Sequence, residues 1–259
     1  MSNHFLLVCL TAFCLQACHS QETTAPTHTS KEDTVEQVEA APNIEAISIS
    51  DSSEYALFLK NLPLKPAGSQ VLLYNGQPKP NQDVHVAVID MELSKRDLQQ
   101  CADAVMRLRG EFLFAQKRFN DIHFNFLSDG KPRYFLKHSN GDTSYKAFRK
   151  YMDWIFTYAN TRSLHNELKK VALADIQAGD VFIVTGRPYG HAVTVMEVGT
   201  QGNRTVFKLA QSYMPAQETH ILKNPLHPEN GGWYFLDEID SDLYTPEWTF
   251  PADALRRFN

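Results

Sequence analysis

The chain has one isolated thiol and one well-placed histidine that could do chemistry together. Cys9, Cys14 and Cys18 lie within the first eighteen residues, and Cys101 stands alone in the rest of the chain. A cysteine hydrolase needs a thiolate, an imidazole that carries protons, a polar group that orients the imidazole, and donors for an oxyanion. Cys101 and His191 are therefore the candidates for nucleophile and base.

The residues around Cys101 predict a helix over about 98–117. Apolar residues recur there at steps of three and four, which defines one buried face: Leu98, Cys101, Val105, Leu108, Phe112 and Ala115. Asp97 and Gln100 have the spacing of a capping box, which puts Cys101 at the fourth helical position, near the positive end of the helix dipole. Ser94 with Asp97 is a competing start that leaves Cys101 two turns into the helix.

The residues around His191 predict a turn and three antiparallel strands. Gly179 and Asp180 form a turn before the apolar run 181–184, and a short loop leads to Gly190 and His191. The following runs, 192–198 and 206–211, are separated by the hairpin sequence 199–203. Gln211 ends the last run. The order is therefore a cysteine on a helix, a histidine opening a strand, and a polar residue on the next strand.

This order resembles the papain-like NlpC and CHAP cell-wall amidases over about residues 98–212. The resemblance implies that Cys101 is the nucleophile, His191 the base and Gln211 the residue that orients the imidazole. It also implies peptidoglycan peptide as the substrate class. The local sequence 100–103 (QCAD) departs from the acid-Cys-Ser-Gly usual in NlpC. The segments 96–103 and 190–193 also resemble a family of bacterial lipoproteins that bears only a domain-of-unknown-function label.

Two other interpretations of the same residues stay open. A lone cysteine on an apolar helix face is more often a small core residue, and His191 beside Gly190 is also compatible with a structural turn histidine. The rival hypothesis for function is a non-catalytic envelope lipoprotein. It would bind a glycan, peptide or protein partner through a groove lined by aromatic residues such as Trp233 and Trp248.

The remaining patterns predict an α+β fold. Short elements are expected at 53–61 (helix), 71–74 (strand) and 84–91 (strand), followed by a helix at 145–159 with an extension at 161–168. Helices come first and antiparallel strands second, which is the α+β pattern. The resemblance adds a papain-like arrangement, with N-terminal helices packed on a C-terminal antiparallel sheet.

The first fifty residues predict export and anchoring. Residues 5–15 are an apolar run of signal-peptide length, although no Lys or Arg precedes them. The sequence 15–18 (LQAC) resembles a bacterial lipobox, which implies a signal peptide over 1–17, a lipid on Cys18 and attachment to a membrane of the bacterial cell envelope. Residues 18–50 lack aromatic side chains and predict a disordered tether. Residues 51–259 are expected to form a single α+β domain.

The composition narrows the function classes. The 259 residues carry a formal net charge of −5 with 43% apolar and 21% charged residues, which is ordinary for a globular protein and argues against nucleic-acid binding. The sequence has no Cys-x-x-Cys or His-x-x-x-His spacing, phosphate loop or dinucleotide glycine pattern, so neither a metal nor a cofactor is expected. The oligomeric state is left open.

Overall fold

The computed structural model of the protein describes residues 46–259, which belong to one compact unit. The predicted signal peptide, Cys18 and most of the predicted tether lie outside the described residues. Within residues 46–259, no helix is long and apolar enough to cross a membrane.

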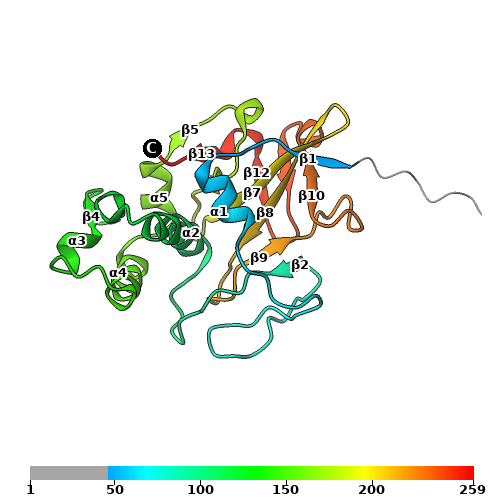
Figure 1. Ribbon diagram of the computed structural model, residues 1–259. Helices are drawn as coiled ribbons and strands as arrows, with labels where there is room; N and C mark the ends of the chain where they lie inside the picture. The colour runs from blue at the N-terminus through cyan, green and yellow to red at the C-terminus, as the bar shows by residue number, and fades with distance from the viewer. Residues whose placement is uncertain (1–45) are drawn as a thin grey trace, which may run out of the picture. The chain divides into compact units, whose positions relative to one another are not determined.

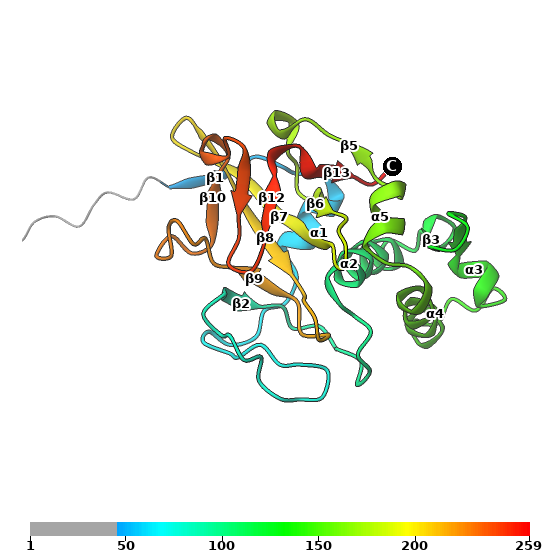
Figure 2. The ribbon, with the colours of Figure 1, turned by 180° about the vertical axis from the view of Figure 1, so that it is seen from behind.

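A nine-stranded antiparallel sheet forms the centre of this unit (Figures 1 and 2). Seven strands follow one another across it: β2 (His85–Val88), β9 (His220–Leu222), β8 (Arg204–Gln211), β7 (His191–Gln201), β6 (Val181–Val184), β13 (Leu255–Arg257) and β5 (Lys169–Lys170). β1 (Ile47–Ile49) pairs with the end of β7, and β10 (Trp233–Phe235) pairs with β8. The predicted strands at 181–184, 192–198 and 206–211 are therefore confirmed, and the last two form the expected hairpin.

The two faces of the sheet bury different hydrophobic clusters. Strand side chains alternate between faces, so Val181 and Ile183 pack into the cluster under the helices, whereas Phe182 packs into the cluster on the other face. That second face is covered by the hairpin of β11 (Asp242–Tyr244) and β12 (Thr249–Pro251). Both faces are covered, which explains why these strands read as continuous apolar runs.

The helices gather on one side of the sheet. α1 (Glu54–Lys60) and α2 (Cys101–Ala115) pack on β7, and α4 (Tyr145–Tyr158) and α5 (Thr161–Glu167) pack around α2 (Figure 1). The other elements are short: α3 (Phe135–His138), β3 (His123–Asn125), β4 (Pro132–Tyr134) and the 3-10 turns Phe119–Asp121, Leu173–Asp175, Leu236–Glu238 and Ala252–Ala254. The α+β class is confirmed.

Two sequence predictions about the fold are wrong. The tether was expected to continue to residue 50, but Ile47–Ile49 already pair with Gly199–Gln201 because this β-branched segment completes the exposed edge of β7. The strand expected at 71–74 does not form. Leu72 and Leu73 make only isolated bridges, to Pro78 and Gln217, within a long loop.

Candidate functional site

Cys101 is the first residue of α2, and Gln100 is its N-cap. Both predicted caps, Asp97 and Ser94, are therefore wrong by one or two turns. The Asp97 carboxylate does not cap the helix, because it accepts a hydrogen bond from the backbone N–H of Ala216, distant in sequence, at 2.7 Å. Asp103 instead accepts a hydrogen bond from the backbone N–H of Gln100 at 3.0 Å and so forms the capping box at the start of the helix. The thiol thus lies at the very N-terminus, closer to the positive end of the dipole than expected.

The Cys101 sulfur lies between two elements that are distant in sequence. Its hydrogen-bond partner is the hydroxyl of Thr161, the first residue of α5, at 3.9 Å. The backbone N–H groups of Ala102 and of Ala192 on β7 also lie against the sulfur and lower the thiol pKa. Burial outweighs them and, together with the nearby Asp103, raises the pKa of the thiol above its ordinary value. Cys101 therefore rests as a neutral thiol at neutral pH.

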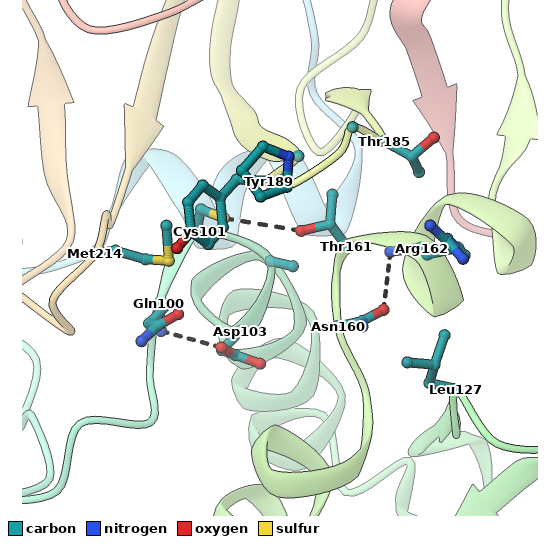
Figure 3. A pocket seen from close by; sticks show the side chains of 14 residues that line it. Gln100, Cys101, Asp103, Leu127, Asn160, Thr161, Arg162, Thr185, Tyr189 and Met214 are labelled. Carbon is teal, nitrogen blue, oxygen red and sulfur yellow. Dashed lines mark hydrogen bonds between the residues drawn. The ribbon is translucent and has the colours of Figure 1, made fainter.

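A pocket of about 400 Å³ opens at Cys101 (Figure 3). Its wall is built from the start of α2, the start of α5 and the loop between β6 and β7. Three of its lining residues, Leu127, Tyr189 and Met214, are large apolar side chains left exposed at 46%, 60% and 37%. Exposed apolar groups around a concave site are typical of a ligand-binding surface. The carboxyl group of Asp103 and the guanidinium of Arg162 also line the pocket.

Gly190 allows the backbone before His191 to approach the end of β6 closely. A Cβ atom at Gly190 would lie 2.3 Å from the carbonyl oxygen of Val184, so the backbones could not approach this closely with any other residue. His191, which opens β7, is 1% exposed. Burial lowers the pKa of His191 to about 4, so the imidazole is neutral at neutral pH.

Aromatic rings enclose the His191 imidazole. The ring centroids of Tyr213, Trp248 and Phe250 lie 4.9, 5.1 and 5.7 Å from that of His191. Trp233 is elsewhere, with the ammonium of Lys208 4.5 Å from its ring centroid. Neither tryptophan lines the Cys101 pocket. Trp248 packs against the His191 imidazole and Trp233 against Lys208, so the two tryptophans do not form one groove at the Cys101 pocket.

A buried chain of hydrogen bonds fixes the tautomer of His191. Gln211, at the end of β8, places its Oε1 2.8 Å from His191 Nε2. Its Nε2 donates to the Glu247 carboxylate at 2.7 Å, and Glu247 also pairs with Lys79 at 2.6 Å. A carboxylate only accepts, so the amide nitrogen of Gln211 faces Glu247 and its oxygen faces the imidazole. His191 Nε2 therefore carries the proton, and Nδ1 keeps its lone pair.

His220 supports the same orientation of Gln211 from the other side. Its Nδ1 lies 2.8 Å from the carbonyl oxygen of Glu218, to which it must donate. Its Nε2 is consequently an acceptor, 3.4 Å from the Gln211 amide nitrogen. Burial lowers the pKa of His220 to about 3, so this ring is neutral as well.

The three predicted site residues are brought to one end of the sheet. Gln211 and His191 are hydrogen-bonded, and the Cys101 sulfur touches the backbone N–H of Ala192, the residue after His191. Among the described residues, however, the sulfur bonds to Thr161 and makes no hydrogen bond to the His191 ring. The catalytic roles of the three residues remain predictions.

Sequence reasoning missed four polar residues of this region. Thr161 and Asp103 line the pocket beside Cys101, while Lys79 and Glu247 stabilise the orientation of Gln211. The sequence offered one usable signal, because Asn160 and Ser163 form a capping box that places Thr161 at a helix start. Nothing local marks Lys79 or Glu247, which lie in loops.

Comparison with known protein families matches residues 36–257 to the family described as a domain of unknown function, DUF4846. The chain belongs to the DUF4846 family. The match begins inside the predicted tether and includes Cys101, His191 and Gln211. The chain matches no curated protein and no solved structure. Within residues 46–259, no group of three or more His, Cys, Asp or Glu side chains could hold a metal ion.

Proposed function

We propose that this DUF4846 protein is a lipid-anchored cysteine amidase or peptidase of the bacterial cell envelope, with a papain-like site that acts on cell-wall peptide. Cys101 is the nucleophile, His191 the base and Gln211 the residue that orients the imidazole. Cys18 carries the lipid, and residues between it and β1 hold the domain away from the membrane surface.

The observation that carries the proposal is the position of the sulfur. A thiol at the first residue of a helix, lining an open pocket and lying against the N–H of Ala192 on the strand that His191 opens, supports a role as nucleophile. The neighbouring histidine is held in one tautomer, and its unprotonated nitrogen makes no hydrogen bond with the residues that the structure describes. A purely structural cysteine needs neither a pocket nor an oriented base.

The resting state is a neutral thiol beside a neutral imidazole, so His191 acts as a general base. The Cys101 side chain turns from Thr161 towards His191, and Nδ1 takes the thiol proton as the S–C bond forms. The carbonyl oxygen becomes an oxyanion, stabilised by backbone N–H groups at the start of α2. The amine then leaves with the proton from Nδ1, and water hydrolyses the thioester in a second, equivalent step.

Trapping of the acyl-enzyme tests this proposal. The full chain is incubated with p-nitrophenyl acetate, and the acetyl group is located by mass spectrometry of the Cys101 peptide. We expect a single acetyl group on Cys101, and acetylation slowed by about 100-fold or more in His191→Ala, because general-base catalysis contributes factors of that size. His123→Ala, which removes a histidine far from the pocket, is the matched control. Acetylation at the same rate without His191 would contradict the mechanism.

A second function has its own supporting observation. The raised pKa of the Cys101 thiol and its hydrogen bond to Thr161 are expected of a structural cysteine in a binding pocket. The protein would then bind a ligand between Leu127, Tyr189 and Met214 without cleaving it. A folded chain that binds ligand and leaves Cys101 unacetylated would favour this function.

A further inference from the structure

Asp103 presents an unpartnered carboxyl oxygen beside Cys101. It is the third residue of α2 and is 7% exposed. Its Oδ2 accepts the N–H of Gln100 at 3.0 Å, whereas its Oδ1 is buried without any hydrogen-bond partner. In Figure 3 this second oxygen turns away from Gln100, towards the side where Asn160 lies. A buried polar atom without a hydrogen-bond partner destabilises the folded protein. A ligand that supplies the missing hydrogen bond would explain why such an oxygen is present here.

The protonation of Asp103 decides what it offers to a ligand. Burial raises the pKa of this carboxyl to about 8, so it is largely the neutral acid at neutral pH. The other titratable groups of its pocket are the neutral thiol of Cys101, the phenol of Tyr189 and the guanidinium of Arg162. Because Oδ2 accepts from Gln100, the proton sits on Oδ1. Asp103 therefore holds an unpartnered O–H donor in the wall of the pocket.

Arg162 supplies the charge of the pocket. Its side chain is exposed, lines the same pocket as Asp103, and makes no ion pair or hydrogen bond among residues 46–259. With Asp103 neutral, the pocket carries one positive charge together with the N-terminal end of α2. This combination favours an anion. The exposed apolar rim of Leu127, Tyr189 and Met214 favours an organic anion over an inorganic one.

We infer that the Cys101 pocket binds an organic carboxylate, which accepts a hydrogen bond from Asp103 and pairs with Arg162. The substrates are then peptides or acyl compounds with a free carboxylate close to the bond that is cleaved. That these ligands are substrates rests on the proposed function, whereas the binding of a carboxylate does not.

Binding of a matched pair of small molecules tests the inference. N-benzoylglycine and its amide share an aromatic group for the apolar rim and differ only in the carboxylate. Calorimetric titration of each into the full chain at pH 7 is expected to show the acid binding at least about tenfold more tightly than the amide, as for a charged hydrogen bond. Equal affinity of the two compounds would overturn the inference.

Variants identify the groups responsible. Arg162→Gln is expected to remove the preference for the acid and, as an exposed residue, should not affect folding. Asp103→Asn keeps an acceptor for Gln100 and an N–H donor for the ligand, so acid binding should change by less than about threefold, whereas Asp103→Ala should weaken it by about tenfold. Tighter binding of the cation N-benzoylethylenediamine, abolished in Asp103→Asn, would overturn the inference by showing that an ionised Asp103 binds ammonium groups.

The failure of this inference is distinguishable from the failure of the proposed function. Loss of carboxylate selectivity while p-nitrophenyl acetate still acetylates Cys101 would overturn only the carboxylate site. Selective binding of N-benzoylglycine by a protein whose Cys101 is never acetylated would support the carboxylate site and contradict the hydrolase.

Discussion

The buried pair of Lys79 and Glu247 gives a prediction whose size follows from its geometry. Their side chains are 5% and 15% exposed, and the Nζ–Oε1 distance is 2.6 Å. Removal of one partner from a buried ion pair costs about 3–5 kcal/mol, because the other charge stays buried. Glu247 keeps some exposure and a donor from Gln211, so Lys79→Met is expected near the lower end, about 3 kcal/mol. Glu247→Gln leaves the more deeply buried Lys79 without its counter-charge, so it is expected to lower the free energy of unfolding by at least as much.

The double variant Lys79→Met/Glu247→Gln separates the pair from its surroundings. The double variant leaves no unpaired buried charge. Its loss of unfolding free energy should therefore be smaller than the sum of the two single losses by about 2 kcal/mol or more. The free energy of unfolding is measured by urea denaturation of the full chain for all four proteins. Single costs below about 1 kcal/mol, or costs that simply add, would refute the argument that the pair is buried and coupled.

The same variants report on the imidazole without any substrate. In Lys79→Met the Glu247 carboxylate still accepts from Gln211, so His191 should stay protonated on Nε2. Long-range proton–nitrogen correlation spectra of the imidazole distinguish the protonated from the bare nitrogen. A change of tautomer in Lys79→Met would show that Lys79, rather than Glu247, sets the orientation of the Gln211 amide.

Two further predictions concern Asp103 and Gly190. The folded-state pKa of Asp103, about 8, lies above the ordinary value, so its contribution to stability is fully present below about pH 4 and is lost as the pH rises towards 8. Asp103→Asn should match the wild type near pH 4 and become the more stable protein by a few kcal/mol at pH 8, measured by urea unfolding; a constant difference would contradict the raised pKa. Gly190→Ala should destabilise by roughly 1–3 kcal/mol and slow Cys101 acetylation, because its Cβ meets the backbone of Val184. Gly110→Ala, whose Cβ meets only side chains of Met152 and Phe148 at 3.2 Å, is the control, and an equal loss in both would contradict the argument.

The sequence predicted the elements that have strong local signals. The helix at 145–159 and the strands at 181–184 and 206–211 were found because apolar periodicity and long apolar runs reflect burial directly. The helix that carries Cys101 was found, but its start was misplaced. Asp97 has the right chemistry for an N-cap, yet its carboxylate bonds to Ala216, 119 residues away, and local spacing does not reveal such a contact.

The candidate site was predictable only in part, for a related reason. Gln211 and His191 occupy matching ends of neighbouring strands, so strand order alone brings them together. Lys79 and Glu247 are 168 residues apart and lie in loops without periodicity. The unpartnered oxygen of Asp103 was hidden as well, because an acid in the first turn of a helix normally reads as a favourable dipole contact. Lys79, Glu247 and Asp103 could therefore be recognised only from the tertiary structure.

The position of β13 inside the sheet has a consequence for the timing of synthesis. β13 is paired on both sides, with β6 and with β5, although it follows all the other strands of this sheet in the sequence. A nascent chain that has already exposed Cys101, His191 and Gln211 therefore still lacks a sheet strand next to β6, and lacks Glu247 to hold the amide. Residues 247–257 must therefore join the fold before the His191 ring is fixed, and chains that lack them hold Cys101, His191 and Gln211 in an incomplete sheet.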